Sequence, residues 1–193
     1  YDADRSFVPL AVTDEQRITV TVDSNAYVSG GVCYETRPTN YSTILGAYHI
    51  ELLTAFGSYE EALAVAQSYP KGFVAYIDGA YRVRVGNHAS YDESARVLSE
   101  TDVLAYGAQI VTPSSTGVVV SVTDTDTVLF EFDCSGLRSL GVRPRSVSGE
   151  KTVTWFSGYR YYGGFEYQRT TGGYISVINV LDIEDYVKCV IAA

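Results

Sequence analysis

The sequence predicts an α+β fold in which residues 46–112 form a split β-α-β arrangement of the ferredoxin-like type, inserted in or flanked by a β-rich domain. Three observations predict it. A helix-capping pattern occurs twice, an Asp-Gly turn lies between the two copies, and strand-like sequence precedes and follows the region. We therefore divide the chain into a β-rich segment 1–45, the central domain 46–112 and a second β-rich segment 113–193.

The first half of the central domain is predicted to run from a strand through a helix to another strand. Tyr48 to Leu53 is a strand-like run. Ser58-Tyr59-Glu60-Glu61 follows as a capping box, in which the Ser58 hydroxyl accepts from the amide three residues on and Glu61 reaches back. Phe73 to Ile77 then has the composition of a buried strand.

The second half repeats this order after a tight turn. Asp78-Gly79 predicts a two-residue hairpin turn, because both residue types tolerate positive φ. Tyr81 to Val85 is the returning strand, and Ser90-Tyr91-Asp92-Glu93 is a second capping box that begins a second helix. A last strand is expected near Val103 to Val111. The agreement of caps, turn and repeat supports the arrangement.

Both flanks are predicted to be strands. Arg17 to Val22 alternates apolar and polar residues, as a half-buried strand does. Residues 113–117 form a linker, after which Val118 to Val122 and Val128 to Phe132 are strand-like. We expect strand pairing or packing between residues 17–34 and 118–180. At the end of the chain, Asp182 is positioned to cap an amphipathic helix that begins at Ile183.

The composition excludes several classes of function. The formal net charge is −9, which repels nucleic acid and anionic lipid. No apolar run reaches the length that spans a bilayer. The chain contains no Met, so we interpret it as a mature or trimmed fragment. An anchoring segment before Tyr1 is left open.

Metal and cofactor sites are not predicted. Cys33, Cys134 and Cys189 are far apart in the sequence, and the two histidines do not cluster with them, which argues against zinc. Isolated buried thiols are favoured over one disulfide plus a free thiol. The acidic turn Asp124-Thr125-Asp126 has too few ligands for a cation and is expected to be solvated.

The central domain resembles the sporulation-related repeat (SPOR) family. The resemblance lies in Tyr59-Glu60-Glu61-Ala62, in Tyr81-Arg82-Val83-Arg84-Val85-Gly86, and in Ser90-Tyr91-Asp92-Glu93-Ser94-Ala95. It covers about a third of the chain. Members of this family bind the glycan strands of peptidoglycan, so the resemblance implies a bacterial cell-wall ligand.

The predicted glycan-binding residues are Arg82, Arg84, Tyr76 and Tyr48. By the period of two along a strand, Val83 and Val85 should face the helices, which leaves Arg82 and Arg84 on the open face of the sheet. Tyr76 on the neighbouring strand is expected to join them, and Tyr48 is a further candidate. Arginine donors and tyrosine rings suit sugar hydroxyls and lactyl carboxylates. The alternative is an ordinary solvated face.

The C-terminal segment resembles the stage II sporulation protein D/LytB family, whose members are lytic transglycosylases or amidase enhancers. The resemblance lies in Tyr161-Tyr162-Gly163-Gly164-Phe165-Glu166 and in the run Val177 to Val187. It implies that the catalytic Glu falls just past Ala193, so we expect this chain alone to be inactive and assign it no catalytic residue. Glu184 and Asp185 lie where a helix dipole stabilises ionised carboxylates, the opposite of what a general acid needs.

Two classes of function follow from these resemblances. The first is the non-catalytic front part of an extracytoplasmic or secreted peptidoglycan-processing enzyme. The second is a purely non-catalytic cell-wall-binding protein. Both predict peptidoglycan glycan strands as the partner, no cofactor and no nucleic acid.

Overall fold

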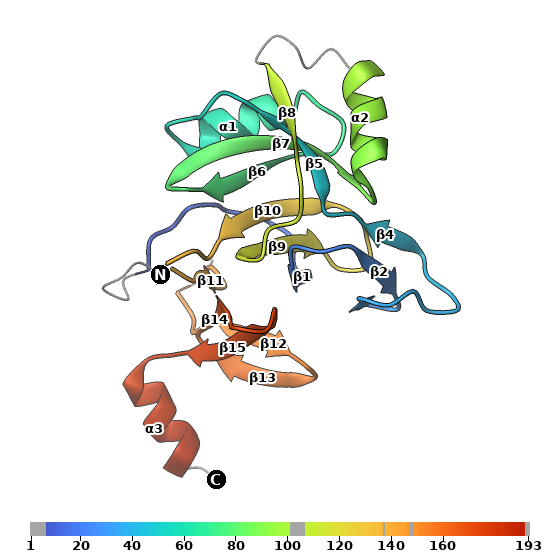
Figure 1. Cartoon of the computed structure of the whole chain (residues 1–193). Helices are drawn as coiled ribbons and strands as arrows, with labels where there is room; N and C mark the ends of the chain where they lie inside the picture. Colours follow the sequence, from blue (N-terminus) through green and yellow to red (C-terminus); the bar gives the residue numbers. More distant parts are fainter. Residues whose placement is uncertain (1–6, 101–106, 137, 147–148, 192–193) are drawn as a thin grey trace. The chain divides into compact units, whose positions relative to one another are not determined.

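The computed structural model describes residues 7–100, 107–136, 138–146 and 149–191. The chain is a mixed α+β protein made mostly of strands, and it divides into two compact units (Figure 1). Residues 9–135 form the larger unit. Residues 136–193 form the smaller unit together with residues 1–8.

The larger unit contains ten strands and two helices among its described residues. In chain order they are β1 (Ile18–Val22), β2 (Ala26–Ser29), β3 (Val32–Tyr34), β4 (Thr43–Leu45), β5 (Tyr48–Leu52), α1 (Tyr59–Ala66), β6 (Gly72–Ile77), β7 (Ala80–His88), α2 (Tyr91–Glu100), β8 (Ala108–Val111), β9 (Gly117–Val122) and β10 (Val128–Asp133).

Seven of these strands form one sheet, in the order β1-β9-β10-β6-β7-β5-β8. Its pairs are antiparallel except β10 with β6, which is parallel. The β-α-β units β5-α1-β6 and β7-α2-β8 interleave, because β7 lies between β5 and β6 while β5 lies between β7 and β8. Of the last predicted strand, Ala108 to Val111 form β8, and residues 103–106 of it lie outside the described residues.

The predicted local signals of this unit are present. The Ser58 and Ser90 hydroxyls accept from the amides of Glu61 and Glu93, each at 3.2 Å. Asp78 and Gly79 have φ values of 51° and 79°, as a turn with two positive φ angles requires. On these two helices Ala62, Ala66 and Ser94 are fully buried, whereas Tyr91 is 54% exposed.

The expected pairing between the two flanks is also present. Ile18 to Val22 of β1 pair with Val122 to Val118 of β9. These flanking strands, with β10, extend the sheet of the interleaved units instead of forming a sheet apart from it. Residues 1–45 and 113–135 thus contribute strands to the same unit as residues 46–112.

Both faces of the large sheet are covered. Helix α1 packs on β6 and β7, while α2 packs on β5, β7 and β8. Strands β3-β2-β4 form a small second sheet, which Figure 1 shows on the side away from the helices. The apolar cluster that joins the two sheets consists of Ala26, Val28, Leu45, Phe73, Val119 and Val128.

The smaller unit is a set of antiparallel strands that ends in a helix. Its elements are β11 (Leu140–Val142), β12 (Val153–Phe156), β13 (Tyr159–Tyr162), β14 (Gly164–Arg169), β15 (Ile175–Val180) and α3 (Ile183–Ile191). The sheets are β11-β14-β15 and the hairpin β12-β13. Leu140, Phe165 and Tyr167 are buried at its centre.

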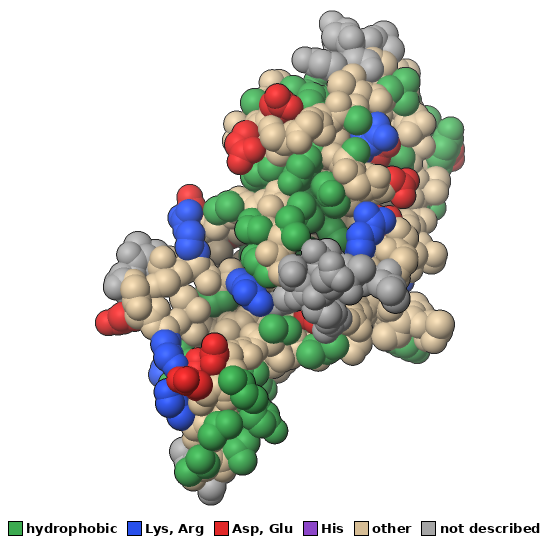
Figure 2. Space-filling model, turned by 90° about the vertical axis from the view of Figure 1, so that its left-hand side faces the viewer, with side chains coloured by type: hydrophobic (Ala, Val, Ile, Leu, Met, Phe, Trp, Pro, Cys, Tyr) green, Lys and Arg blue, Asp and Glu red, His purple; other side chains and the backbone are tan. Residues whose placement is uncertain are grey.

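Helix α3 begins as the sequence predicts, with Asp182 as its cap. The Asp182 carboxylate accepts from the amide of Glu184 at 2.9 Å. Its apolar side chains are exposed and gather on the surface over α3 in Figure 2; they are Ile183, Tyr186, Val187, Val190 and Ile191. Among the described residues no helix is long and apolar enough to cross a membrane.

Candidate functional site

The four residues predicted to bind glycan do not share one surface. In the register of β6 and β7, Tyr76 lies opposite Tyr81, whereas Arg82 lies opposite Ala75. Residues directly opposite each other in an antiparallel pair project from the same face. Tyr76 is therefore on the helix-covered face, and the two arginines are on the other, contrary to the expectation that Tyr76 joins them.

Tyr48 lies apart from both groups. It pairs with His88, at the opposite end of β7 from the Tyr76–Tyr81 pair. Tyr48 is half-buried. It lies on the same face of β5 as Ile50 and Leu52, which are both fully buried on the helix side. The sequence could not show which face of this run is buried, and the structure separates Tyr48 from the arginines.

Arg84 is the largest departure from the prediction. As expected, alternation along β7 places Arg84 on the other face of the sheet from Val83 and Val85. That face, however, is not open where Arg84 lies. Its side chain is only 7% exposed. The guanidinium Nε donates to Glu51 Oε2 at 2.9 Å, and Nη1 lies 2.5 Å from Glu131 Oε1. Its charge is already matched inside the protein, so Arg84 is not available to a glycan carboxylate.

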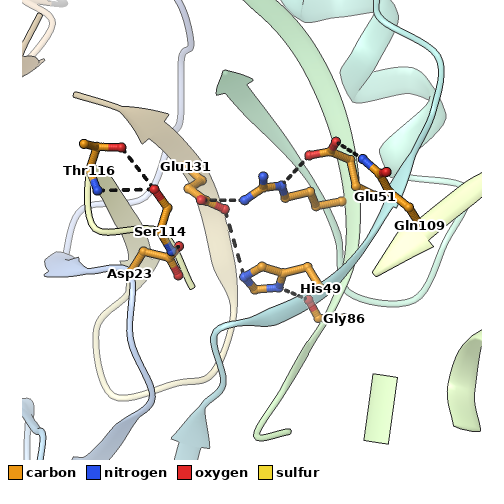
Figure 3. Close-up of polar contacts among 9 residues, drawn as sticks. Asp23, His49, Glu51, Gly86, Gln109, Ser114, Thr116 and Glu131 are labelled. Atoms are coloured by element: carbon orange, nitrogen blue, oxygen red, sulfur yellow. Dashed lines mark hydrogen bonds and ion pairs between the residues drawn. The ribbon is translucent and has the colours of Figure 1, made fainter. Parts of the chain in front are cut away.

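Arg84 belongs to a chain of polar side chains that are buried except for Gln109, here named the Arg84 cluster; Figure 3 draws it and labels its other members. Its members are His49, Glu51, Arg84, Gln109 and Glu131, and they come from four strands of the large sheet. Gln109 Nε2 donates to Glu51 Oε1 at 3.2 Å. His49 Nε2 lies 4.0 Å from Glu131 Oε2, and both side chains are essentially inaccessible to solvent.

A β-bulge fixes the ring of His49. The register between β5 and β7 shifts between Tyr48 and Ile50, so Gly86 and Asn87 lie opposite His49. Gly86 has φ +77°, a conformation that L side chains rarely adopt. Its carbonyl lies 2.7 Å from His49 Nδ1. A carbonyl only accepts, so Nδ1 carries the proton and Nε2 of the neutral ring is an acceptor facing Glu131.

The cluster holds more negative than positive charge. One guanidinium serves two carboxylates, and apart from the contact of Glu131 with Arg84, neither the Glu131 oxygens nor His49 Nε2 have a hydrogen-bond partner in the described part of the chain. Burial lowers the pKa of His49, although the Glu131 carboxylate opposes this shift. Burial also pulls the pKa of Arg84 down, but Glu131 and Glu51 outweigh it and the net direction is upward. Arg84 is thus a firmly held internal cation.

Arg82 is the predicted residue that keeps contact with solvent. It is half-buried, and its Nη1 donates to the Leu53 carbonyl at 3.2 Å. The remaining guanidinium donors have no partner among the described residues. Arg82 can therefore still bind an anionic group, although without Arg84 and Tyr76 beside it.

Tyr76 belongs to an aromatic group on the helix side. Its ring stacks on Phe132 with an interplanar angle of 7° and meets Tyr81 edge-on at 5.0 Å between centroids. Tyr81 and Tyr59 donate their hydroxyls to the carbonyls of Leu10 and Val12. These rings anchor the segment before β1, which explains their presence without a ligand.

In the smaller unit, the contacts made by Asn179 and Asp185, in the run that resembles the stage II sporulation protein D/LytB family, are structural. Asn179 Nδ2 lies 3.1 Å from the Tyr162 carbonyl and 3.0 Å from the Gly164 carbonyl, so it ties β15 to the end of β13. The Asp185 carboxylate forms an ion pair with Lys151. This pairing agrees with the structural interpretation of Asp185.

No group of three metal-binding side chains is found in the parts of the chain that are described. No disulfide joins Cys33 to Cys134, and Cys134 is buried. In comparisons of the chain with family models, curated proteins and solved structures, no match is found.

The first prediction concerns Arg84. Arg84→Ala leaves two carboxylates buried beside each other without their cation, and breaking a buried ion pair in this way typically costs about 3–5 kcal/mol. We expect the free energy of unfolding, measured by urea denaturation, to fall by about that amount. This replaces the expectation that Arg82 and Arg84 both lie on an open face of the sheet.

The matched control is Arg82→Ala, on the same strand and the same face. It removes one hydrogen bond from a half-exposed side chain and should cost about 1 kcal/mol or less. Equal losses from the two variants would contradict the assignment of Arg84 as an internal cation.

The second prediction concerns pH. In the unfolded chain His49 is protonated at about pH 6.5. In the folded protein it is protonated only at lower pH, because burial lowers the pKa of His49. The unfolded state then binds more protons, so the free energy of unfolding falls as pH drops from about 6.5 toward the lowered pKa. Burial lowers the pKa of His88 as well, which adds a loss of the same sign.

His49→Asn separates the contributions of the two histidines to the pH dependence, because it removes the titrating ring of His49. The Asn amide can still donate to the Gly86 carbonyl. Urea unfolding at several pH values between about 7.5 and 5 should show a shallower pH dependence for this variant than for the parent. His88→Asn is the control for the second histidine. A pH dependence unchanged by His49→Asn would refute the neutral buried state of His49.

Proposed function

We propose that this is an extracytoplasmic bacterial cell-wall protein that binds the glycan strands of peptidoglycan. In this proposal residues 46–112 are a SPOR-like glycan-binding domain with a ferredoxin-like arrangement. Residues 113–193 include the non-catalytic front part of a domain like that of stage II sporulation protein D/LytB proteins. The alternative within the same proposal is a protein with a wall-binding role alone.

The observation that carries the proposal is the interleaving of the two β-α-β units. The strand order β6-β7-β5-β8, with one helix in each unit, is the order expected of a split β-α-β domain. The residues that resemble the SPOR family lie within these two units, which supports the proposal. The two capping serines begin α1 and α2, and Tyr81 to Gly86 form the central part of β7. Fold alone does not assign a function, so the motif and the fold are used together.

The structure narrows the binding surface that this proposal can use. Arg84 forms ion pairs with Glu51 and Glu131, and Tyr76 lies on the opposite face of the sheet. Arg82 remains as a cation on the side away from the helices. Its donors suit a lactyl carboxylate or sugar hydroxyls, and charge-assisted hydrogen bonds are among the stronger ones.

The smaller unit favours the non-catalytic interpretation of the residues present. A transglycosylase needs a carboxyl group held protonated beside the glycosidic oxygen. Asp185 is instead paired with Lys151, and Glu184 lies exposed in the first turn of α3. We therefore assign neither carboxylate a catalytic role.

Co-sedimentation with purified sacculi tests the proposal. We expect the chain to pellet with sacculi whose stem peptides have been removed by an amidase, and to be released as salt is raised, because a cation supplies part of the affinity. Arg82→Ala should weaken this binding by roughly tenfold, as the loss of one charge-assisted hydrogen bond implies.

Arg96→Ala is the matched control, since it removes one exposed arginine from α2 in the same unit. It should pellet as the parent does. A parent chain that stays in the supernatant with amidase-treated sacculi would refute glycan binding, and equal binding by Arg82→Ala would remove Arg82 from the site.

A further inference from the structure

The hairpin β12-β13 of the smaller unit presents a sheet face with unusual composition. Its turn is Ser157-Gly158, with φ values of 48° and 84°, the two positive angles of a tight two-residue hairpin. The register pairs Trp155 with Arg160 and Val153 with Tyr162. By strand alternation these four side chains project from one face of the hairpin.

The opposite face of the hairpin packs inward, which fixes the orientation of the first. Phe156 and Tyr161 contact Phe165 of β14, with ring centroids 4.8 Å and 5.3 Å apart. Phe165 itself is 4% exposed. The hairpin cannot turn over without losing these contacts, so its other face is held outward.

The outward face is exposed, aromatic and cationic. Trp155 is 64% exposed, Val153 41% and Tyr162 40%. The Arg160 guanidinium carbon lies 4.7 Å from the centroid of the Trp155 ring. No carboxylate is paired with Arg160 in the part of the chain that the structure describes. An unmatched cation over an exposed aromatic ring is unusual on a chain whose net charge is −9.

Lys151 is a second cation near this face, but its charge is already paired. Its ammonium lies 6.0 Å from the Tyr162 ring and is paired with Asp185. This ion pair ties the edge of the face to α3 and occupies the charge of Lys151. Arg160 is therefore the cation that is open to a ligand.

We propose that the face formed by Val153, Trp155, Arg160 and Tyr162 binds a carboxylate-bearing glycan strand. Trp155 and Tyr162 contact the apolar faces of sugar rings, and Arg160 binds a carboxylate on the sugar. This inference rests on the proposed function and adds a second, separate surface to it, in the smaller unit.

Charge complementarity selects this occupant over others. A purely apolar protein partner would bury Arg160 without a counter-charge, which is costly. A nucleic acid carries a negative charge on every nucleotide, so the acidic chain as a whole would repel it more strongly than a glycan with one carboxylate per disaccharide. A carboxylated sugar chain offers alternating apolar ring faces and single negative charges, which match the rings and the guanidinium.

Trp155 makes the proposal directly measurable, because it is the only tryptophan in the chain. Its fluorescence is followed while the full chain is titrated with a peptide-free oligosaccharide of alternating N-acetylglucosamine and N-acetylmuramic acid. The comparison ligand is an N-acetylglucosamine oligosaccharide of equal length, which lacks carboxylates. We expect a saturable change in emission with both, at lower concentration with the carboxylated ligand.

Arg160→Gln tests the role of the charge. It should raise the dissociation constant for the carboxylated oligosaccharide about tenfold and leave that for the neutral one nearly unchanged. The matched control is Arg37→Gln, because Arg37 also lies over an aromatic ring, that of Tyr41 at 5.1 Å, in the other unit. This control should bind as the parent does.

The outcomes separate this inference from the proposed function. If the parent pellets with amidase-treated sacculi but Trp155 emission does not respond to the carboxylated oligosaccharide, this face is not a binding site and the proposed function stands. If Arg160→Gln binds both oligosaccharides as tightly as the parent does, the role of Arg160 is overturned. A parent chain that binds neither sacculi nor oligosaccharide refutes both proposals.

Discussion

The larger unit depends on one guanidinium shared between two buried carboxylates. Arg84 of β7 reaches Glu51 on the adjacent strand β5 and Glu131 on β10, which lies beyond β6. The direct pairing of β10 with β6 covers only Phe130 to Phe132. The ion pair between Arg84 and Glu131 is therefore a second tie between the flanking strands and the interleaved core, on the face away from the helices.

This arrangement decides where a ligand can bind. A buried guanidinium with two carboxylate partners has no remaining charge to offer, and the burial of Ala75 and Glu131 shows that the surrounding face is closed. The sheet face that the sequence offered as a glycan site is thus part of the interior near Arg84. Surfaces with unmatched cations lie elsewhere, at Arg82 in the larger unit and at Arg160 in the smaller one, and our proposals use these.

Local sequence signals predicted the core of the larger unit well. The capping serines and the Asp78-Gly79 turn are short-range features, since each is set by residues within a few positions, and they give the order of strands and helices. The strands β2, β4, β11 and β13 were not predicted. They are short, and their pairing with neighbouring segments, which stabilises them, is a tertiary feature.

The site was less predictable than the fold, for a physical reason. Alternation along β7 correctly separates Arg84 from Val83 and Val85, but it cannot tell whether the second face is covered. Whether that face is covered depends on Glu131, which lies about 50 positions away along the chain. The pairing of β10 with β6 brings Glu131 close to Arg84. A polar residue in the apolar run of β10, Val-Leu-Phe-Glu-Phe, was the available signal, because a buried acid needs a partner.

The most direct test of this account is the coupling between Arg84 and Glu131. The free energy of unfolding is measured for the parent, for Arg84→Met, for Glu131→Gln and for the double variant. Arg84→Met in the parent leaves two buried carboxylates, but with Glu131→Gln it leaves one. The account predicts that Arg84→Met costs less in the Glu131→Gln background, by at least about 1 kcal/mol. Equal costs in the two backgrounds, within about 0.5 kcal/mol, would contradict it.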